Sequence, residues 1–249
     1  MKASKRRVVL PKLNTLHLKI IALLSMTIDH LSYALGRQGT INGTMYGIGR
    51  SIGRLAFPIY VYLLLIGFFK THNKVKYALR LFLFALISEI PLDYFHSGIT
   101  MDFAYQNVFF ELLAIFFVYL CFDEIDKRKH WHVAFQGLLK AFTMLSVGFW
   151  TTICHFDYAW FGIAVGVTLY TAYQSRKNKT ICGFIMLLGF ALTIPFEMLF
   201  NPFSVLILAV IPLLLLCDDT KRIKQPKIVQ FGFYAYYPIH LLLLGVIFR

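Results

Sequence analysis

The sequence predicts an all-α, polytopic integral membrane protein, a bundle of about nine transmembrane helices that forms a single domain over residues 1–249. Of the 249 residues, 58% are hydrophobic and only 15% are charged, whereas soluble domains carry roughly a quarter charged residues. Apolar runs of about 17–22 residues recur along the chain, and each can cross a hydrocarbon core of about 30 Å. The runs are continuous and do not alternate with period two, so they predict helices.

The predicted spans are separated by short segments with ordinary loop signals. The first span follows a basic segment, MKASKRRVVLPKLN, and shows no small-residue cleavage site, so we expect a retained helix and not a signal peptide. The glycine-rich segment 36–50 is expected to be the first loop. YFHSG, QSRKNK and DDTKRIKQPK are later loops, and none leaves room for a soluble appendage. In order, the predicted spans are 14–35, 51–69, 77–95, 105–122, 132–153, 158–174, 180–199, 202–217 and 228–248.

The formal charge of +13 follows from membrane topology. If the N-terminus lies inside, only Arg37, Arg50, Arg54 and Arg249 of the 25 basic residues fall on the outer side and Lys140 falls within a span, which leaves 25 − 5 = 20 at the inner side. This asymmetry follows the positive-inside rule and predicts an N-in, C-out protein of the cytoplasmic (inner) membrane. No nucleic-acid partner is needed to explain the charge. The four cysteines show no paired spacing, and no metal site is implied.

Polar residues gather near the predicted outer ends of several spans. Ionisable groups inside a membrane are costly and usually mark function, although they can also be interfacial charges that pair and hold helices together. Because several helices place such groups at one level, we expect a polar cavity that opens outward. The set comprises Asp29, His30, Arg50, Arg54, Glu89, Asp93, Asn107, Glu111, His155, Asp157 and Glu197.

Within this set, His30 is the candidate for proton transfer, because imidazole titrates near neutral pH. Asp29 lies about 100° away around the helix, so it is not assumed to orient His30. A lone membrane histidine more often joins helices through a hydrogen bond than acts in catalysis, and that alternative stays open. A second histidine, His240, lies within the last span after Pro238, which favours a kink.

Other sequence patterns point to packing and not to chemistry. Gly162 and Gly166 have the small-xxx-small spacing that predicts close helix contact. The chain has no phosphate-binding glycine loop, no GxSxG elbow and no HExxH motif.

Six segments, spread over most of the chain, resemble the TraX family. They are LKIIALLSMTIDH (18–30), IGRLAFPIYVYLLLIGF (52–68), RLFLFALISEIPLD (80–93), QNVFFEL (106–112), DYAWFGI (157–163) and FYAYYPIHLLLL (233–244). TraX proteins are associated with conjugative transfer and with N-terminal acetylation of pilin. The family is similar to the acyltransferase-3-type membrane enzymes, which move acyl groups from cytoplasmic acyl-CoA to acceptors across the membrane.

The wider acyltransferase group carries a first-helix motif of a basic residue, ten residues and then histidine. Lys19 and His30 fit this spacing, with Lys in place of the commoner Arg, and Lys lacks the bidentate grip of Arg on phosphate. Eleven residues make about three helical turns, or about 16 Å, so both side chains are expected to share one face. Lys19 would bind the phosphates of CoA; the alternative is that it only extends to the lipid headgroups on the inner side.

The resemblance implies a membrane-embedded acyltransferase. It would transfer acetyl from cytoplasmic acetyl-CoA to an amine or hydroxyl of an envelope peptide, pilin or glycan on the outer side of the lipid bilayer. His30 would be the general base, and the other residues would shape the site or stabilise developing charge. The expected catalytic residues are His30, Asp29, Arg54, Glu89, Asn107 and Glu111, and the expected acyl-CoA-binding residues are Lys19 and His240.

Two other classes of function remain as alternatives. A small-solute transporter would also carry charges within the membrane, but an inverted repeat would be expected and none is found. A non-catalytic assembly component of a conjugation or secretion apparatus would use the same polar groups only to pair its helices.

Overall fold

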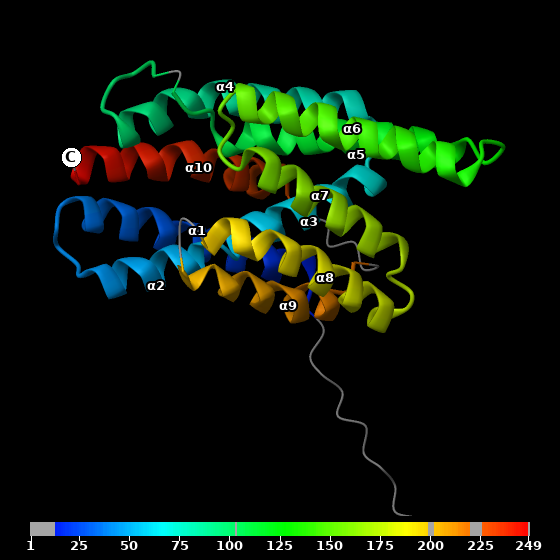
Figure 1. The fold of residues 1–249 in the computed structure, drawn as a ribbon. Coiled ribbons are helices and arrows are strands. Elements are labelled where there is room, and N and C mark those ends of the chain that lie inside the picture. The colour runs from blue at the N-terminus through cyan, green and yellow to red at the C-terminus, as the bar shows by residue number, and fades with distance from the viewer. Residues whose placement is uncertain (1–12, 103, 199–201, 220–225, 249) are drawn as a thin grey trace, which may run out of the picture.

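The computed structural model describes residues 13–102, 104–198, 202–219 and 226–248. In these ranges the chain forms ten α-helices and one 3₁₀ helix, and no strand (Figure 1). The prediction of an all-α fold is therefore confirmed. The helices are α1 (Thr15–Arg37), α2 (Gly43–Gly53), α3 (Ala56–Lys70), α4 (Lys74–His96), α5 (Val108–Lys127), α6 (Val133–Ile153), α7 (Ala159–Gln174), α8 (Lys179–Met198), η1 (Pro202–Ala209), α9 (Val210–Leu216) and α10 (Lys227–Ile247).

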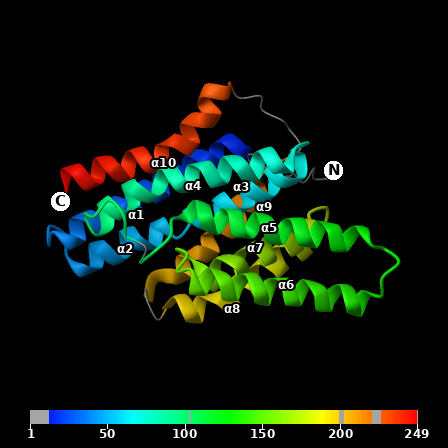
Figure 2. The same ribbon diagram turned by 90° about the horizontal axis from the view of Figure 1, so that it is seen from above.

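The long helices lie side by side with their axes roughly along one direction (Figures 1 and 2). α10 is last in the sequence, yet it packs on α4 and α1. α5, α6 and α7 form a neighbouring group, which α8 extends through its contact with α7. α10 contains Pro238, and Figure 2 shows this helix bending along its length, as the proline predicts.

α3 lies at the centre of the bundle because its sequence, AFPIYVYLLLIGFFK, is apolar on every side. It contacts α1, α5, α7 and α9, and Ile59, Leu65 and Phe68 are completely buried. α6 behaves in the opposite way and exposes large apolar side chains, among them Phe142 and Trp150. Such an exposed apolar surface is typical of a helix that faces lipid.

Four helices in the described ranges are long and apolar enough to cross a membrane: Thr15–Arg37, Gly43–Lys70, Val133–Ile153 and Ile228–Ile247. Two further apolar helices are shorter, Lys179–Pro195 and Val205–Leu216. The chain therefore has the helices of a membrane protein. The total of about nine spans and the N-in orientation stay predictions. The basic residues Lys2, Lys5, Arg6, Arg7, Lys12, Lys221, Arg222, Lys224 and Arg249 lie outside the described ranges, as does the side chain of Glu197.

The predicted loop at 36–50 is wrong over its second half, where α2 begins at Gly43. Asn42 caps this helix, because its side-chain oxygen accepts a hydrogen bond from the Met45 amide at 2.9 Å. The glycines that indicated a loop instead form a packing face. A Cβ added at Gly49 would lie 1.8 Å from the Ser32 hydroxyl oxygen of α1. α2 can therefore lie this close to α1 only because Gly49 has no side chain.

The same kind of contact joins α7 to α5, as the spacing of Gly162 and Gly166 predicted. A Cβ at Gly162 would lie 2.2 Å from a carboxyl oxygen of Glu111, and one at Gly166 would lie 2.8 Å from Ile115. The prediction of close helix packing at this pair is confirmed.

Polar contacts tie the helix ends together at each end of the bundle. At one end, Lys74 at the start of α4 and Lys127 at the end of α5 contact the Asp123 carboxylate at 2.7 and 2.9 Å. Partial burial raises the pKa of the Asp123 carboxyl. The hydrogen bonds from Lys74 and Lys127 lower it by more, so the pKa lies below its ordinary value. At the other end, Arg37 donates hydrogen bonds to the carbonyls of Phe95 and His96 at 3.2 and 2.8 Å.

Candidate functional site

One face of α1 is directed at α10 along most of its length. The Lys19 ammonium lies 5.0 Å from the centre of the Phe233 ring. Further along, the hydroxyls of Thr27 and Tyr236 are 2.7 Å apart. Still further along α1, His30 contacts His240, which lies on α10 as Phe233 and Tyr236 do. Lys19 and His30 therefore share one face of α1, as their eleven-residue spacing predicted.

His30 and His240 form a hydrogen-bonded pair between α1 and α10. Nδ1 of His30 lies 2.6 Å from Nε2 of His240. The rings are nearly parallel, 15° apart, with centroids separated by 4.9 Å. Since the centroids are so much further apart than the bonded nitrogens, the rings meet edge to edge and not face to face. The other nitrogen of His240, Nδ1, lies 2.8 Å from the backbone carbonyl oxygen of Tyr236.

Asp29 faces a different neighbour from His30. Its carboxylate forms an ion pair with Arg50 of α2 at 2.7 Å. The contact is possible because Gly53 lies under Asp29: an added Cβ would be 2.2 Å from the Asp29 carboxyl oxygen. Arg54 follows directly as the residue that ends α2. Asp29 and Arg50 thus fix α2 against α1.

Glu89 of α4 and Asn107 at the start of α5 lie in contact. The Asn107 oxygen accepts a hydrogen bond from the Phe109 amide at 3.0 Å and so caps α5. The Asn107 amide nitrogen donates to the Ala85 carbonyl at 2.7 Å and also to a carboxylate oxygen of Glu89. One buried asparagine therefore starts α5 and fastens it to α4.

Glu111 lies one turn beyond Asn107 and is completely buried beneath Gly162 of α7. Neither of its carboxyl oxygens makes a hydrogen bond of ordinary geometry within the described part of the chain. The N–H groups of Tyr158 and Ala159, where α7 begins, approach it. A buried carboxyl in this position is unusual, because nearly all buried polar groups have a partner.

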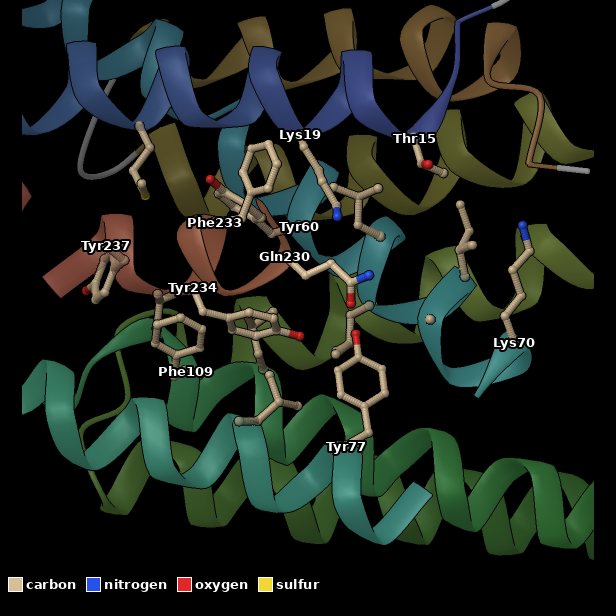
Figure 3. A pocket seen from close by; sticks show the side chains of 18 residues that line it. Thr15, Lys19, Tyr60, Lys70, Tyr77, Phe109, Gln230, Phe233, Tyr234 and Tyr237 are labelled. Atoms are coloured by element: carbon tan, nitrogen blue, oxygen red, sulfur yellow. The ribbon is translucent and has the colours of Figure 1, made fainter. Parts of the chain in front are cut away.

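A pocket with a volume of about 270 Å³ lies between α1, α3, α4, α5 and α10. Figure 3 shows Lys19 reaching into it from α1, with Lys70 and Tyr237 at its opposite ends. Leu63, Leu64 and Phe109 make much of the wall apolar, and polar groups come from tyrosines such as Tyr60, Tyr77 and Tyr234. The lining does not include Asp29, His30, Arg54, Glu89, Asn107, Glu111 or His240.

Tyr237 connects this pocket to the histidine pair. It lines the pocket, and its ring centroid lies 6.1 Å from that of His30, 5.8 Å from that of His240 and 5.5 Å from that of Phe109. One aromatic ring thus lies between the pocket and two imidazoles. The pocket suits an elongated, mainly apolar group whose anionic end remains near Lys19 and Lys70.

Of the residues that line the pocket, sequence reasoning identified only Lys19. Tyr60, Leu63, Gly67 and Lys70 were missed, although their spacing places them on one face of a helix. That stripe was a usable signal. It was hidden because α3 is apolar on its other faces as well.

Comparison with known proteins gives one family and one relative of nearly equal length. A family model described as "TraX protein" matches residues 15–248. The chain is 26% identical over 241 residues to the probable fimbrial assembly protein FimC, serogroup H1, of Dichelobacter nodosus; the match covers 91% of this chain and 92% of that protein. No solved structure matches the chain.

Proposed function

The chain belongs to the TraX family, and from that premise we propose that it is a membrane-embedded acyltransferase that acts in pilus or fimbrial assembly. It transfers acetyl from cytoplasmic acetyl-CoA to an amine or hydroxyl on the outer side of the membrane. The similarity to a protein named for fimbrial assembly favours pilin, or another envelope peptide or glycan, as the acceptor.

The observation that carries this proposal is the pocket that begins near Lys19 and Lys70 and ends one ring away from His30. The mainly apolar pocket of about 270 Å³ suits the slender arm of acetyl-CoA. The phosphates and adenosine would remain at the cationic end, near Lys19 and Lys70. Lys19 and His30 are separated by about 16 Å along α1, which is comparable to the reach of an extended pantetheine arm. The thioester would then lie beside Tyr237, next to the histidine pair.

In the proposed reaction His30 is the general base. It removes a proton from the acceptor amine or hydroxyl, whose electron pair then attacks the thioester carbonyl. The carbon–sulfur bond breaks, CoA leaves as a thiolate, and the proton held on His30 neutralises the leaving sulfur. Arg54, Glu89, Asn107 and Glu111 keep their proposed role of shaping the acceptor side and stabilising charge.

The non-catalytic alternative also has an observation in its favour. Asp29 is paired with Arg50, and Glu89 with Asn107, as in a protein whose polar groups only join helices. An assembly component of this kind would not consume acetyl-CoA, so one assay separates the two functions.

The experiment measures the release of free CoA from acetyl-CoA by the purified, detergent-solubilised protein in the presence of an envelope extract as acceptor. His30→Ala is expected to lower the rate by about 10²–10⁴-fold, because it removes the general base. His72→Ala is the matched control, since His72 is an exposed histidine between α3 and α4. A correctly inserted His30→Ala protein with near-normal transfer would exclude this mechanism. A wild-type protein that releases no CoA would favour the assembly role.

A further inference from the structure

We propose that His240 is the positioning residue for His30: it accepts a hydrogen bond from His30 Nδ1–H and so leaves Nε2 of His30 as the atom that takes the proton. This inference rests on the proposed function, because it names the partner of the proposed general base. It also gives His240 a role different from the contact with acyl-CoA that the sequence predicted.

The direction of the hydrogen bonds follows from the Tyr236 backbone carbonyl, which can accept a hydrogen bond but cannot donate one. A backbone carbonyl only accepts, so the 2.8 Å contact between His240 Nδ1 and the Tyr236 oxygen requires the hydrogen to be on His240 Nδ1. In a neutral imidazole the other nitrogen, Nε2, is then an acceptor. His30 Nδ1, at 2.6 Å from it, must therefore carry the second hydrogen. Nε2 of neutral His30 is left with a free lone pair.

Tyr236 holds this arrangement from two sides. Its ring is parallel to that of His240, 13° apart with centroids separated by 5.0 Å, while its carbonyl fixes His240 Nδ1. Tyr236 is itself fixed to α1, where its hydroxyl lies 2.7 Å from Thr27, and the Thr27 hydroxyl donates to the Leu23 carbonyl at 2.8 Å. α1 and α10 are thus joined twice, by the contact between His30 and His240 and by the contact between Thr27 and Tyr236.

His30 has aromatic neighbours on its other sides. The Phe95 ring stands edge-on to it at 5.9 Å, and the Tyr237 ring lies at 6.1 Å. Neither of these contacts distinguishes one imidazole tautomer from the other. Without an acceptor at His30 Nδ1, the hydrogen can move to Nε2, and a ring in that tautomer offers no lone pair to the acceptor substrate. A base held in the wrong tautomer loses most of its rate, which in serine proteases amounts to about 10⁴-fold in kcat.

Three substitutions at His240 separate positioning from packing. Glutamine places an amide oxygen where Nε2 of histidine lies and can still accept from His30. Asparagine reaches only the nearer position, that of Nδ1, and cannot. Leucine fills space without accepting. Each variant is purified, its insertion and thermal unfolding are compared with wild type, and kcat and KM for acetyl-CoA are measured by CoA release.

We expect the two amide variants, His240→Gln and His240→Asn, to differ in kcat. His240→Asn and His240→Leu lower kcat by about 10²–10³-fold with KM changed by less than about threefold, while His240→Gln stays within about tenfold of wild type. Equal activity of all three variants, or equal loss in all three despite normal folding, overturns the inference, as does a rise in KM without a fall in kcat. If wild type itself releases no CoA, the proposed function fails first, so the two failures are distinguishable.

Discussion

Lys19 is the residue whose role depends most on what fills the pocket. Its ammonium lies 5.0 Å from the centre of the Phe233 ring, and the residue lines the pocket on the side of α1. A lysine in this place can bind the phosphates of CoA, or it can extend toward lipid headgroups. The two roles differ in kinetics, because only phosphate binding affects the affinity for the donor.

We expect Lys19→Ala to raise KM for acetyl-CoA about tenfold or more with little change in kcat, since a hydrogen bond to a charged group contributes about 1.5–3 kcal/mol. Lys19→Arg should retain a low KM, because Arg binds phosphate at least as well. Lys129→Ala is the control, as Lys129 is exposed between α5 and α6. An unchanged KM in Lys19→Ala would assign Lys19 to the headgroups.

Asn107 offers a prediction about stability that is separate from catalysis. Asn107→Ser can keep the cap of α5, because a serine oxygen can accept from the Phe109 amide, but it loses the contacts with Ala85 and Glu89. Asn107→Ala loses both. We expect thermal unfolding in detergent to show a loss of about 1–3 kcal/mol for Ala and a smaller loss for Ser. Equal losses in the two variants would show that the cap adds nothing.

At the scale of the element, α2 depends on glycine for its approach to α1. A Cβ at Gly53 would lie 2.2 Å from the Asp29 carboxyl, whereas one at Gly43 in the same helix would meet nothing within 4 Å. We therefore expect Gly53→Ala to destabilise the protein by about 1–3 kcal/mol, as overpacking does, and Gly43→Ala to be neutral or slightly stabilising. Thermal unfolding of the two variants in one detergent gives the comparison. A neutral Gly53→Ala would mean that Asp29 and Arg50 can move apart freely.

Helices were predictable from this sequence wherever an apolar run was long and continuous, as in α1, α6 and α10. α2 was not, because Gly47, Gly49 and Gly53 read as loop residues when their neighbours in space are unknown. The partner of His30 was also beyond sequence reasoning. His240 is 210 positions away, and spacing along one helix indicates a shared face but not which helix packs against it.

For the whole molecule, the contacts at the helix ends define two ends of the bundle. Lys74, Asp123 and Lys127 meet at one end, where Tyr173 also donates to Asp219 at 2.6 Å. At the other end Gln38 donates to the Phe248 carbonyl at 2.9 Å. The segments that the charge asymmetry assigned to the cytoplasm thus meet one another, which supports a single membrane orientation for the entire bundle.

Labelling of single cysteines tests which end faces the cytoplasm. Cys154 at the end of α6 is exposed, so the background variant is Cys154→Ser, into which Ile99→Cys or Lys129→Cys is introduced. Both positions are exposed, Ile99 between α4 and α5 and Lys129 between α5 and α6. In intact spheroplasts a membrane-impermeant maleimide should label Ile99→Cys, and it should label Lys129→Cys only after permeabilisation. The reason is that basic loops remain in the cytoplasm. Labelling of Lys129→Cys from outside would reverse the bundle, and acetyl-CoA in the cytoplasm would then face the end opposite to Lys19 and Lys70.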